Sequence, residues 1–233
     1  MTSSRPTCAG RDSPESTTGA APTGPNLIVG LTGGVASGKS AACERFAALG
    51  VPIVDADRVA RDVVQPGEPA LDELVAAFGD TILTPEGTLD RGAMRERAFA
   101  DDSERQRLEA IIHPRIRERM QQQLAACGAA YVIMAVPLLI ESNMTAMVHR
   151  VLVVDVPEAV QERRLQQRDD ATVEQARAMR QAQASRQRRL QQADDVIDNT
   201  GSIAALNAAV DRLDRTYRAL AASKGQAPGP PEG

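Results

Sequence analysis

Five short, almost continuously apolar runs alternate along the chain with segments in which apolar residues recur at helical spacing. The runs are rich in β-branched residues, which is typical of parallel strands buried on both faces. They are LIVGLT at 27–32, VPIVDA at 51–56, YVIMAV at 131–136, RVLVVDV at 150–156 and DVIDN at 195–199. Because strands alternate with helices, we predict an α/β fold with a three-layer, parallel five-stranded sheet.

Three of the intervening helices have clear sequence signals. After the first run, Ala42, Phe46 and Leu49 share one helix face. Another helix is predicted to begin at Pro157–Glu158, because a proline and an acid suit the first turn. A last helix is predicted over about 202–222, with an apolar stripe along one side. The stripe consists of Ile203, Leu206, Val210, Leu213, Tyr217 and Leu220.

Two connections between the predicted strands are too long to be simple crossovers. Residues 58–129 contain several helical patterns and no clear strand, so we predict a helical insertion there. Residues 163–190 form a shorter insertion that is rich in arginine. Ligands of an open α/β sheet bind beyond the carboxyl ends of its strands, and both insertions leave from those ends. The predicted core is 27–57, 130–162 and 191–222.

The two ends of the chain have a different composition from the rest. Residues 1–26 and 225–233 are rich in small polar residues, Pro and Gly, and they are predicted to be disordered. The first of these segments has no apolar region of the kind found in a signal peptide. One folded domain is therefore expected over about 27–224.

Composition then narrows the classes of function. A net charge of −4 and an aromatic content of 2% argue against a nucleic-acid partner. There is no apolar run of about 18 residues, so no membrane-spanning helix is expected. The three cysteines lack pairing or metal-ligand spacing, which fits a reducing compartment. We therefore expect a cytoplasmic protein.

The first apolar run leads into GLTGGVASGKSA, which has the spacing of a phosphate-binding loop between a strand and a helix. Its backbone N–H groups and the helix N-terminus are predicted to hold the phosphates of a nucleoside triphosphate. Lys39 is expected to span the β- and γ-phosphates, and Ser40 to ligate Mg²⁺. The predicted nucleotide contacts are Gly33, Gly34, Val35, Ala36, Ser37, Gly38, Lys39, Ser40 and Ala41. The loop alone does not say whether water or a second substrate takes the γ-phosphate.

Two aspartates stand at the end of the second apolar run. Alternation along a strand would place Asp55 and Asp57 on the same side. A carboxylate at the mouth of a kinase site can orient an acceptor hydroxyl and take its proton. Aspartate is equally a good N-cap for a helix that is predicted to begin near Arg58. The two interpretations are equally favoured. We expect Asp55 to have the structural role and Asp57 the chemical role.

The arginine-rich insertion 163–190 also allows two interpretations. Arg164 and Arg168 are spaced i, i+4 on one helix face, and Arg186 and Arg189 are spaced i, i+3. A basic flap of this kind can stabilise a transferring phosphoryl group. The alternative is a solvated helix face or a nucleic-acid patch. Beside a phosphate-binding loop, we favour the flap.

Two further segments carry weaker signals. Pro114 in LEAIIHPRIR is predicted to break or restart a helix. His113, just before it, is either a structural residue or a substrate contact. DNTG at 198–201 is a turn by composition, and such a loop can lie against the base in a nucleotide-binding sheet.

Together these segments resemble the dephospho-coenzyme A kinase family of P-loop kinases. The shared motifs are GLTGGVASGKS, VDADRVAR, LEAIIHPRIR, VPLLIE, VLVVDVP with RRLQQRDD, and ASRQRRLQQADDVIDNTG, in this order over about 27–220. The resemblance implies a P-loop NTPase fold like that of nucleoside monophosphate kinases. In that fold, 58–129 would be a CoA-binding insertion and 163–190 a lid. It also implies transfer of the ATP γ-phosphate to the ribose 3′-hydroxyl of dephospho-CoA, the last step of CoA biosynthesis.

The resemblance further assigns roles on the two substrate sides of the site. The implied residues are Asp57 as general base, Lys39 and Arg164 on the phosphates, Ser40 on Mg²⁺, Arg186 in the lid, Asn199 and Gly201 near the adenine, and His113 and Pro114 on the CoA side. The implied partners are ATP and dephospho-CoA, with Mg²⁺ as cofactor. Neither a nucleic acid nor a membrane is implied, and we expect a monomer.

Two positions depart from the pattern of this family. Ala36 stands where glycine is usual. Because alanine at positive φ would cost about 1 kcal/mol or more, we expect no positive φ at this position. Ala41 stands where Ser or Thr is common, so a hydroxyl near the α-phosphate is missing.

Two other functions remain as alternatives. One is a different P-loop small-molecule kinase, acting on a nucleoside monophosphate or on shikimate. This alternative is disfavoured by the DAD motif at 55–57 and the HP motif at 113–114. The other is a nucleotide-hydrolysing switch, which is disfavoured because the chain contains no N-K-x-D motif for reading guanine.

Overall fold

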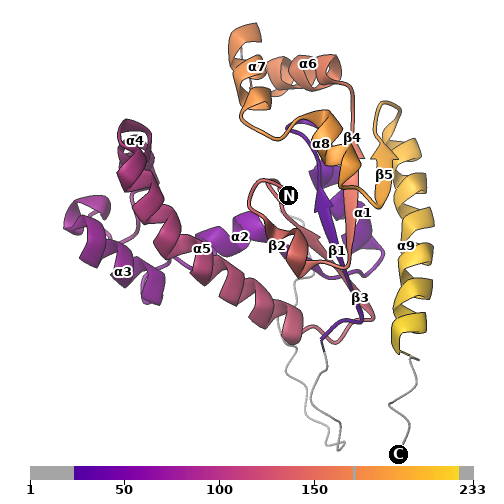
Figure 1. Ribbon diagram of the computed structural model, residues 1–233, viewed down its shortest axis with the longest axis horizontal. Coiled ribbons are helices and arrows are strands. Elements are labelled where there is room, and N and C mark those ends of the chain that lie inside the picture. The colour runs from indigo at the N-terminus through magenta and orange to yellow at the C-terminus, as the bar shows by residue number, and fades with distance from the viewer. Residues whose placement is uncertain (1–23, 170–171, 226–233) are drawn as a thin grey trace, which may run out of the picture. The chain divides into compact units, whose positions relative to one another are not determined.

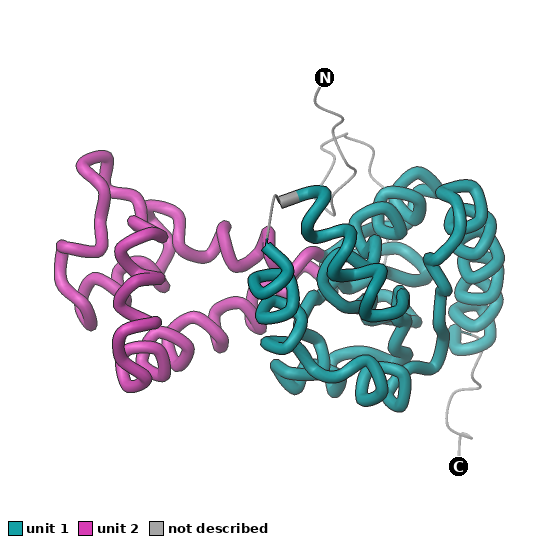
Figure 2. Tube along the Cα trace, turned by 90° about the horizontal axis from the view of Figure 1, so that it is seen from above, with its two compact units in different colours: residues 1–54, 124–233 teal, residues 55–123 magenta. Residues whose placement is uncertain are grey.

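The computed structural model describes residues 24–169 and 172–225. The ends that are predicted to be disordered, 1–26 and 225–233, therefore lie almost entirely outside the described residues. The chain divides into two compact units (Figure 2), Met1–Val54 with Leu124–Gly233, and Asp55–Gln123. Each unit is described in turn.

A five-stranded sheet in the order β2-β3-β1-β4-β5 is the centre of the first unit (Figure 1). β1 pairs in parallel with β3 and β4, and β4 pairs in parallel with β5. The strands are β1 (Leu27–Thr32), β2 (Ile53–Asp55), β3 (Tyr131–Ala135), β4 (Arg150–Asp155) and β5 (Asp195–Asp198). The predicted α/β fold is confirmed. Because β1 and β4 are neighbours, the loops that follow them meet at one edge of the sheet.

The helices of the first unit follow the predicted alternation. They are α1 (Lys39–Ala48), α6 (Glu158–Asp169), α7 (Val173–Gln181), α8 (Arg186–Gln191) and α9 (Ile203–Gly225), with a short 3₁₀ helix η2 (Met144–Met147). α1 and α9 pack on the sheet through a buried cluster that contains Phe46, Val210 and Tyr217. The rings of Phe46 and Tyr217 are stacked with their centroids 6.3 Å apart, and Tyr131 of β3 meets Tyr217 edge-on at 5.7 Å.

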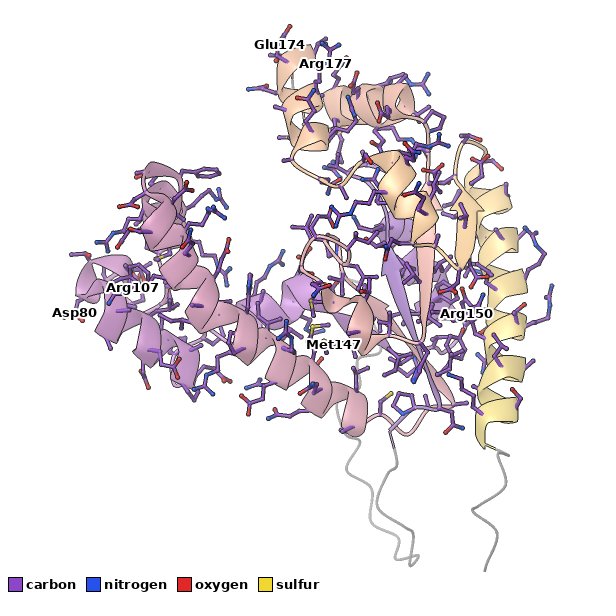
Figure 3. All side chains as sticks on the ribbon, viewed as in Figure 1. Asp80, Arg107, Met147, Arg150, Glu174 and Arg177 are labelled. Atoms are coloured by element: carbon purple, nitrogen blue, oxygen red, sulfur yellow. The ribbon has the colours of Figure 1, made fainter. Side chains whose placement is uncertain are left out.

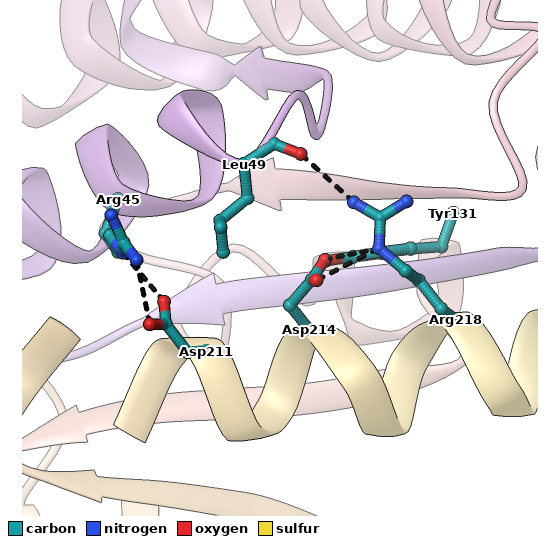
Figure 4. Close-up of polar contacts among 6 residues, drawn as sticks. All are labelled: Arg45, Leu49, Tyr131, Asp211, Asp214 and Arg218. Carbon is teal, nitrogen blue, oxygen red and sulfur yellow. Dashed lines mark hydrogen bonds and ion pairs between the residues drawn. The ribbon is translucent and has the colours of Figure 1, made fainter. Parts of the chain in front are cut away.

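Polar side chains join α9 to α1 and the sheet around this apolar cluster. Arg45 forms a two-pronged ion pair with Asp211 at 2.7 and 2.8 Å (Figure 4). Asp214 accepts from the Tyr131 hydroxyl at 2.6 Å and is also paired with Arg218. The two-pronged Arg45–Asp211 contact restrains the orientation of α9 relative to α1, whereas the Asp214–Arg218 pair lies within α9.

A second polar network lies at the outer strands. Arg150, which is labelled on β4 in Figure 3, donates to Asp195 of β5 at 2.9 and 3.2 Å. The Tyr217 hydroxyl donates to the same carboxylate at 2.9 Å. Burial and this neighbouring carboxylate both raise the pKa of Tyr217, so its hydroxyl stays a donor.

The second unit consists mainly of helices. They are α2 (Ala56–Asp62), α3 (Pro69–Phe78), a 3₁₀ helix η1 (Asp80–Ile82), α4 (Arg91–Ala100) and most of α5 (Asp102–Ala125). Leu74, Ile82 and Met94 are buried in its core. Two guanidinium groups, those of Arg97 and Arg107, contact the Phe78 ring at 5.6 and 5.4 Å from its centroid.

The predicted helix break at Pro114 is wrong, because Pro114 lies inside the continuous helix α5. A proline removes one N–H bond and displaces the carbonyl one turn earlier. Pro114 and His113 are both exposed, so water can reach this face of the helix and bind the displaced carbonyl.

The predicted strand alternation at Asp55 and Asp57 is also wrong. β2 ends at Asp55, and Asp57 is the second residue of α2. The Asp55 carboxylate accepts from the backbone N–H of Asp57 at 2.9 Å and of Arg58 at 3.3 Å. This N-cap starts the helix immediately after the strand. The structural role expected for Asp55 is therefore confirmed.

Candidate nucleotide-binding site

The segment 33–38 joins the central strand β1 directly to α1. Gly38 is the N-cap of α1 and has φ +100°, a conformation that favours glycine. A Cβ atom at Gly38 would also lie 2.2 Å from Asn199 Nδ2. Both the backbone conformation and the lack of space therefore exclude a side chain at this position. Lys39, the first residue of α1, donates from Nζ to the carbonyl oxygen of Gly33 at 3.0 Å. The loop therefore closes on itself around the N-terminus of a helix, the arrangement that binds phosphates.

The expectation that Ala36 avoids positive φ is wrong, because φ is +56° at this residue. Its backbone is held by contacts on the carbonyl side of the loop. Arg164 donates from NH1 to Ala36 O at 3.3 Å, and Asn199 donates from Nδ2 to Ser37 O at 2.7 Å. The curvature of the loop therefore sets the conformation, and alanine adopts it at an energetic cost.

An Ala36→Gly variant should be more stable than the parent by about 1 kcal/mol, because glycine adopts positive φ without strain. The expected rise in melting temperature is about 2–4 °C for a chain of this size. Thermal unfolding followed by circular dichroism measures it. The matched control is Ala208→Gly on the exposed face of α9, where glycine should lower the melting temperature. A fall in both variants would contradict the strain at Ala36.

Two of the residues assigned to the nucleotide side by resemblance contact the loop. Arg164 of α6 also donates to Ser37 O at 3.5 Å and, from NH2, to Asn199 O at 2.9 Å. Asn199, which follows β5, thereby touches both the loop and Arg164. Gly201 is exposed in the same turn, and a Cβ atom added to it would meet only Ala205, at 3.5 Å.

Arg186 does not contact the loop but pairs with the end of β4. Its Nε and NH2 donate to the Asp155 carboxylate at 2.7–3.0 Å. This hydrogen bonding raises the pKa of Arg186, which therefore stays charged. A cavity of about 650 Å³ lies beside the pair. Its lining residues are Pro157, Glu158, Arg186, Gln187, Leu190 and Gln191.

Sequence reasoning missed two glutamines that contact the front of the loop. Gln183, after α7, accepts the backbone N–H of Val35 with Oε1 at 2.7 Å. Gln161 of α6 is fully buried against Gly34. Gln183 carries no charge or motif that would single it out. For Gln161 there was a signal, because it stands one helical turn before the buried Leu165, at a position where the helix pattern favours an apolar residue.

The remaining candidates belong to the second unit. Asp57 is exposed at the start of α2, and His113 and Pro114 are exposed on α5. The described parts of the chain contain no cluster of three or more His, Cys, Asp or Glu side chains arranged to hold a metal ion. Within the same described residues, no helix has the length and apolar character needed to span a bilayer.

Comparisons with known proteins give consistent matches over most of the chain. A family model described as dephospho-CoA kinase matches residues 27–205. A dephospho-CoA kinase of Xanthomonas axonopodis pv. citri is 52% identical over 199 residues, which are 84% of this chain and 98% of that protein.

Two solved structures also resemble the chain. One, from Thermus thermophilus, has a TM-score of 0.70 at 29% identity and covers 89% of this chain and 100% of its own. The other, a dephospho-CoA kinase from Campylobacter jejuni, has a TM-score of 0.63 at 25% identity and covers 86% and 98%. Sequence, fold and loop agree, and the chain belongs to the dephospho-CoA kinase family.

Proposed function

We propose that this chain transfers the γ-phosphate of ATP to the ribose 3′-hydroxyl of dephospho-CoA, which yields CoA and ADP in the last step of CoA biosynthesis. One observation carries the proposal. A single family match extends over residues 27–205, so it includes the phosphate-binding loop, Asp57, and the His113–Pro114 motif together. Relatives that share the loop alone would not match across the second unit.

The loop supplies the groups that suit a bound polyphosphate. The N–H groups at the start of α1 bind phosphate oxygens, and Lys39 moves from Gly33 O to the β- and γ-phosphates. Arg164 is assigned to the phosphates as well, and a guanidinium has five N–H donors, more than its three contacts with the loop and Asn199 use. Arg186, Asn199 and Gly201 complete the nucleotide side.

Ser40 fits the role of the Mg²⁺ ligand. It is the second residue of α1, and its side chain is exposed beside the loop. Mg²⁺ takes oxygen ligands, keeps several waters and is commonly held by one or two protein groups plus substrate phosphates. When bound, the ion neutralises charge on the β- and γ-phosphates. A single exposed hydroxyl at this place is consistent with such a site.

On the acceptor side, Asp57 is the proposed general base. Its carboxylate would orient the ribose 3′-hydroxyl and take its proton as the phosphoryl group is transferred. His113 and Pro114 are proposed to contact the CoA side. With a net charge of −4, the chain is proposed to act without a nucleic acid or membrane partner, as a monomer in the cytoplasm.

The test is whether ADP formation depends on the acceptor. Purified full-length chain with ATP and Mg²⁺ should release ADP only when dephospho-CoA is added, and CoA should appear in equal amount by mass spectrometry. Nucleoside monophosphates and shikimate serve as alternative acceptors in parallel reactions. Turnover without any acceptor would favour a nucleotide-hydrolysing switch, and turnover with one of the alternatives would favour another small-molecule kinase.

A further inference from the structure

Buried polar atoms without a hydrogen-bond partner gather at one place in the described part of the chain. They are Ser37 Oγ, Gln161 Nε2, Gln161 Oε1 and Arg189 Nε. The first two glycines of the loop mark this place. A Cβ atom on Gly33 would lie 2.6 Å from Ser37 Oγ, and one on Gly34 would lie 2.0 Å from Gln161 Nε2 and 2.8 Å from Arg189 NH2.

Gln161 is the most costly of these groups, because its side chain is fully buried and both of its polar atoms lack a partner. An unpaired carboxamide in an apolar environment destabilises a fold, so buried amides are nearly always bonded in native proteins. An apolar residue of the same size would suit the inward face of α6 better, as Leu165 does one turn later. The carboxamide is therefore expected to gain its partner in another state of the protein.

The surroundings indicate that this partner is an anion. The backbone N–H of Val35 donates to Gln183 Oε1 at 2.7 Å. The loop thus presents a backbone donor to an oxygen atom at this place, and such donors also bind phosphate oxygens. Arg189 is 3% exposed; its Nη1 donates to the carbonyl oxygen of Ala184, and its Nε has no hydrogen-bond partner among the described residues. Burial lowers the pKa of Arg189 although the carboxylates of Glu141, Asp155 and Glu158 raise it, so its charge is only partly compensated. An amide donor and a buried cation on a phosphate-binding loop together suit a phosphate.

We propose that Gln161 is a further substrate-contacting residue, whose Nε2 donates to the terminal phosphate of a nucleoside triphosphate bound on the loop. Its place against Gly34, at the front of the loop, is at the opposite end from Gly38 and the first turn of α1. A contact limited to the terminal phosphate distinguishes a triphosphate from a diphosphate. The inference rests on the proposed function in taking ATP as the ligand of the loop.

The experiment compares ATP and ADP binding to full-length Gln161→Leu and to the parent by isothermal titration calorimetry, with Mg²⁺ and without acceptor. Loss of a hydrogen bond to a charged group should weaken ATP binding about tenfold or more, whereas ADP binding should stay within about twofold. The melting temperature without nucleotide should be equal or higher, because an unpaired buried amide is removed. Gln161→Met tests the same contact with an unbranched side chain, and Gln167→Leu on the exposed side of α6 is the control.

Two results would overturn the proposal. Equal weakening of ATP and ADP together with a lower melting temperature would mean that Gln161 only supports the loop. Unchanged binding of both nucleotides would mean that it contacts neither. If the parent converts dephospho-CoA and either result is found, this inference alone fails. If the parent binds no ATP, the proposed function fails with it.

Discussion

An Asp57→Asn variant should bind ATP with the affinity of the parent and lose about 100-fold or more in kcat with dephospho-CoA. Asparagine keeps the size of the side chain but cannot accept the proton of the ribose hydroxyl. The fold should be unaffected, because Asp57 is exposed and the N-cap of α2 is Asp55. Steady-state kinetics at saturating substrates measures kcat, and calorimetry with ATP alone measures nucleotide affinity.

Asp55→Asn is the matched control for this variant. Asparagine is as good an N-cap as aspartate, so α2 should still begin at Ala56 and kcat should change only slightly. A large loss in Asp55→Asn with normal kcat in Asp57→Asn would exchange the two roles. An unchanged kcat in both would remove these carboxylates from the mechanism.

The strands and the loop could be predicted from the sequence because their signals are local. The five apolar runs match β1 to β5 with differences only at their ends. The expected burial on both faces is wrong for β5, an edge strand of which only Ile197 is buried. The spacing of Gly33, Gly38 and Lys39 is likewise a local backbone requirement. Gly38 shows why glycine is required in the loop, because positive φ and the close approach of Asn199 both exclude a side chain there.

The features that were mispredicted depend on contacts between distant segments or on solvent. Ala36 is held at positive φ by a loop whose carbonyls bind Arg164 and Asn199, far away in sequence, and these contacts outweigh its preference for negative φ. Pro114 is tolerated inside α5 because its face of the helix is exposed. Asp57 is a local exception, because the Asp55 side chain caps a helix that begins at Ala56, still within the apolar run, so the strand ends before Asp57.

The two glutamines at the loop show why a neutral polar residue is difficult to assign from sequence. Gln161 and Gln183 lie more than a hundred residues after the loop, and only the packing of α6 and α7 brings them to Gly34 and Val35. A search of the sequence for charged residues or known motifs does not select a neutral carboxamide side chain. A polar residue in the buried stripe of an otherwise ordinary helix is the signal that remains, and Gln161 is the case in which it applies.

Lys39→Ala should damage both nucleotide binding and catalysis. Lys39 Nζ donates to Gly33 O at 3.0 Å, and with ATP bound it would span the β- and γ-phosphates. Loss of a charge-assisted contact should weaken ATP binding about tenfold or more. The variant also lacks a preorganised cation that would stabilise the negative charge of the transition state, so kcat should fall by a further factor of about 100–1000.

The pattern of effects separates the lysine from the carboxylate. Lys39→Ala should change the affinity for ATP, whereas Asp57→Asn should leave it unchanged, since of these two residues only the lysine is assigned to the nucleotide. The control is Lys224→Ala at the exposed end of α9, which should change neither quantity. Calorimetry and kinetics are read beside a melting curve, because the hydrogen bond to Gly33 contributes only about 1 kcal/mol to stability. A Lys39→Ala variant that keeps its ATP affinity would mean that the phosphates are held by the backbone of the loop alone.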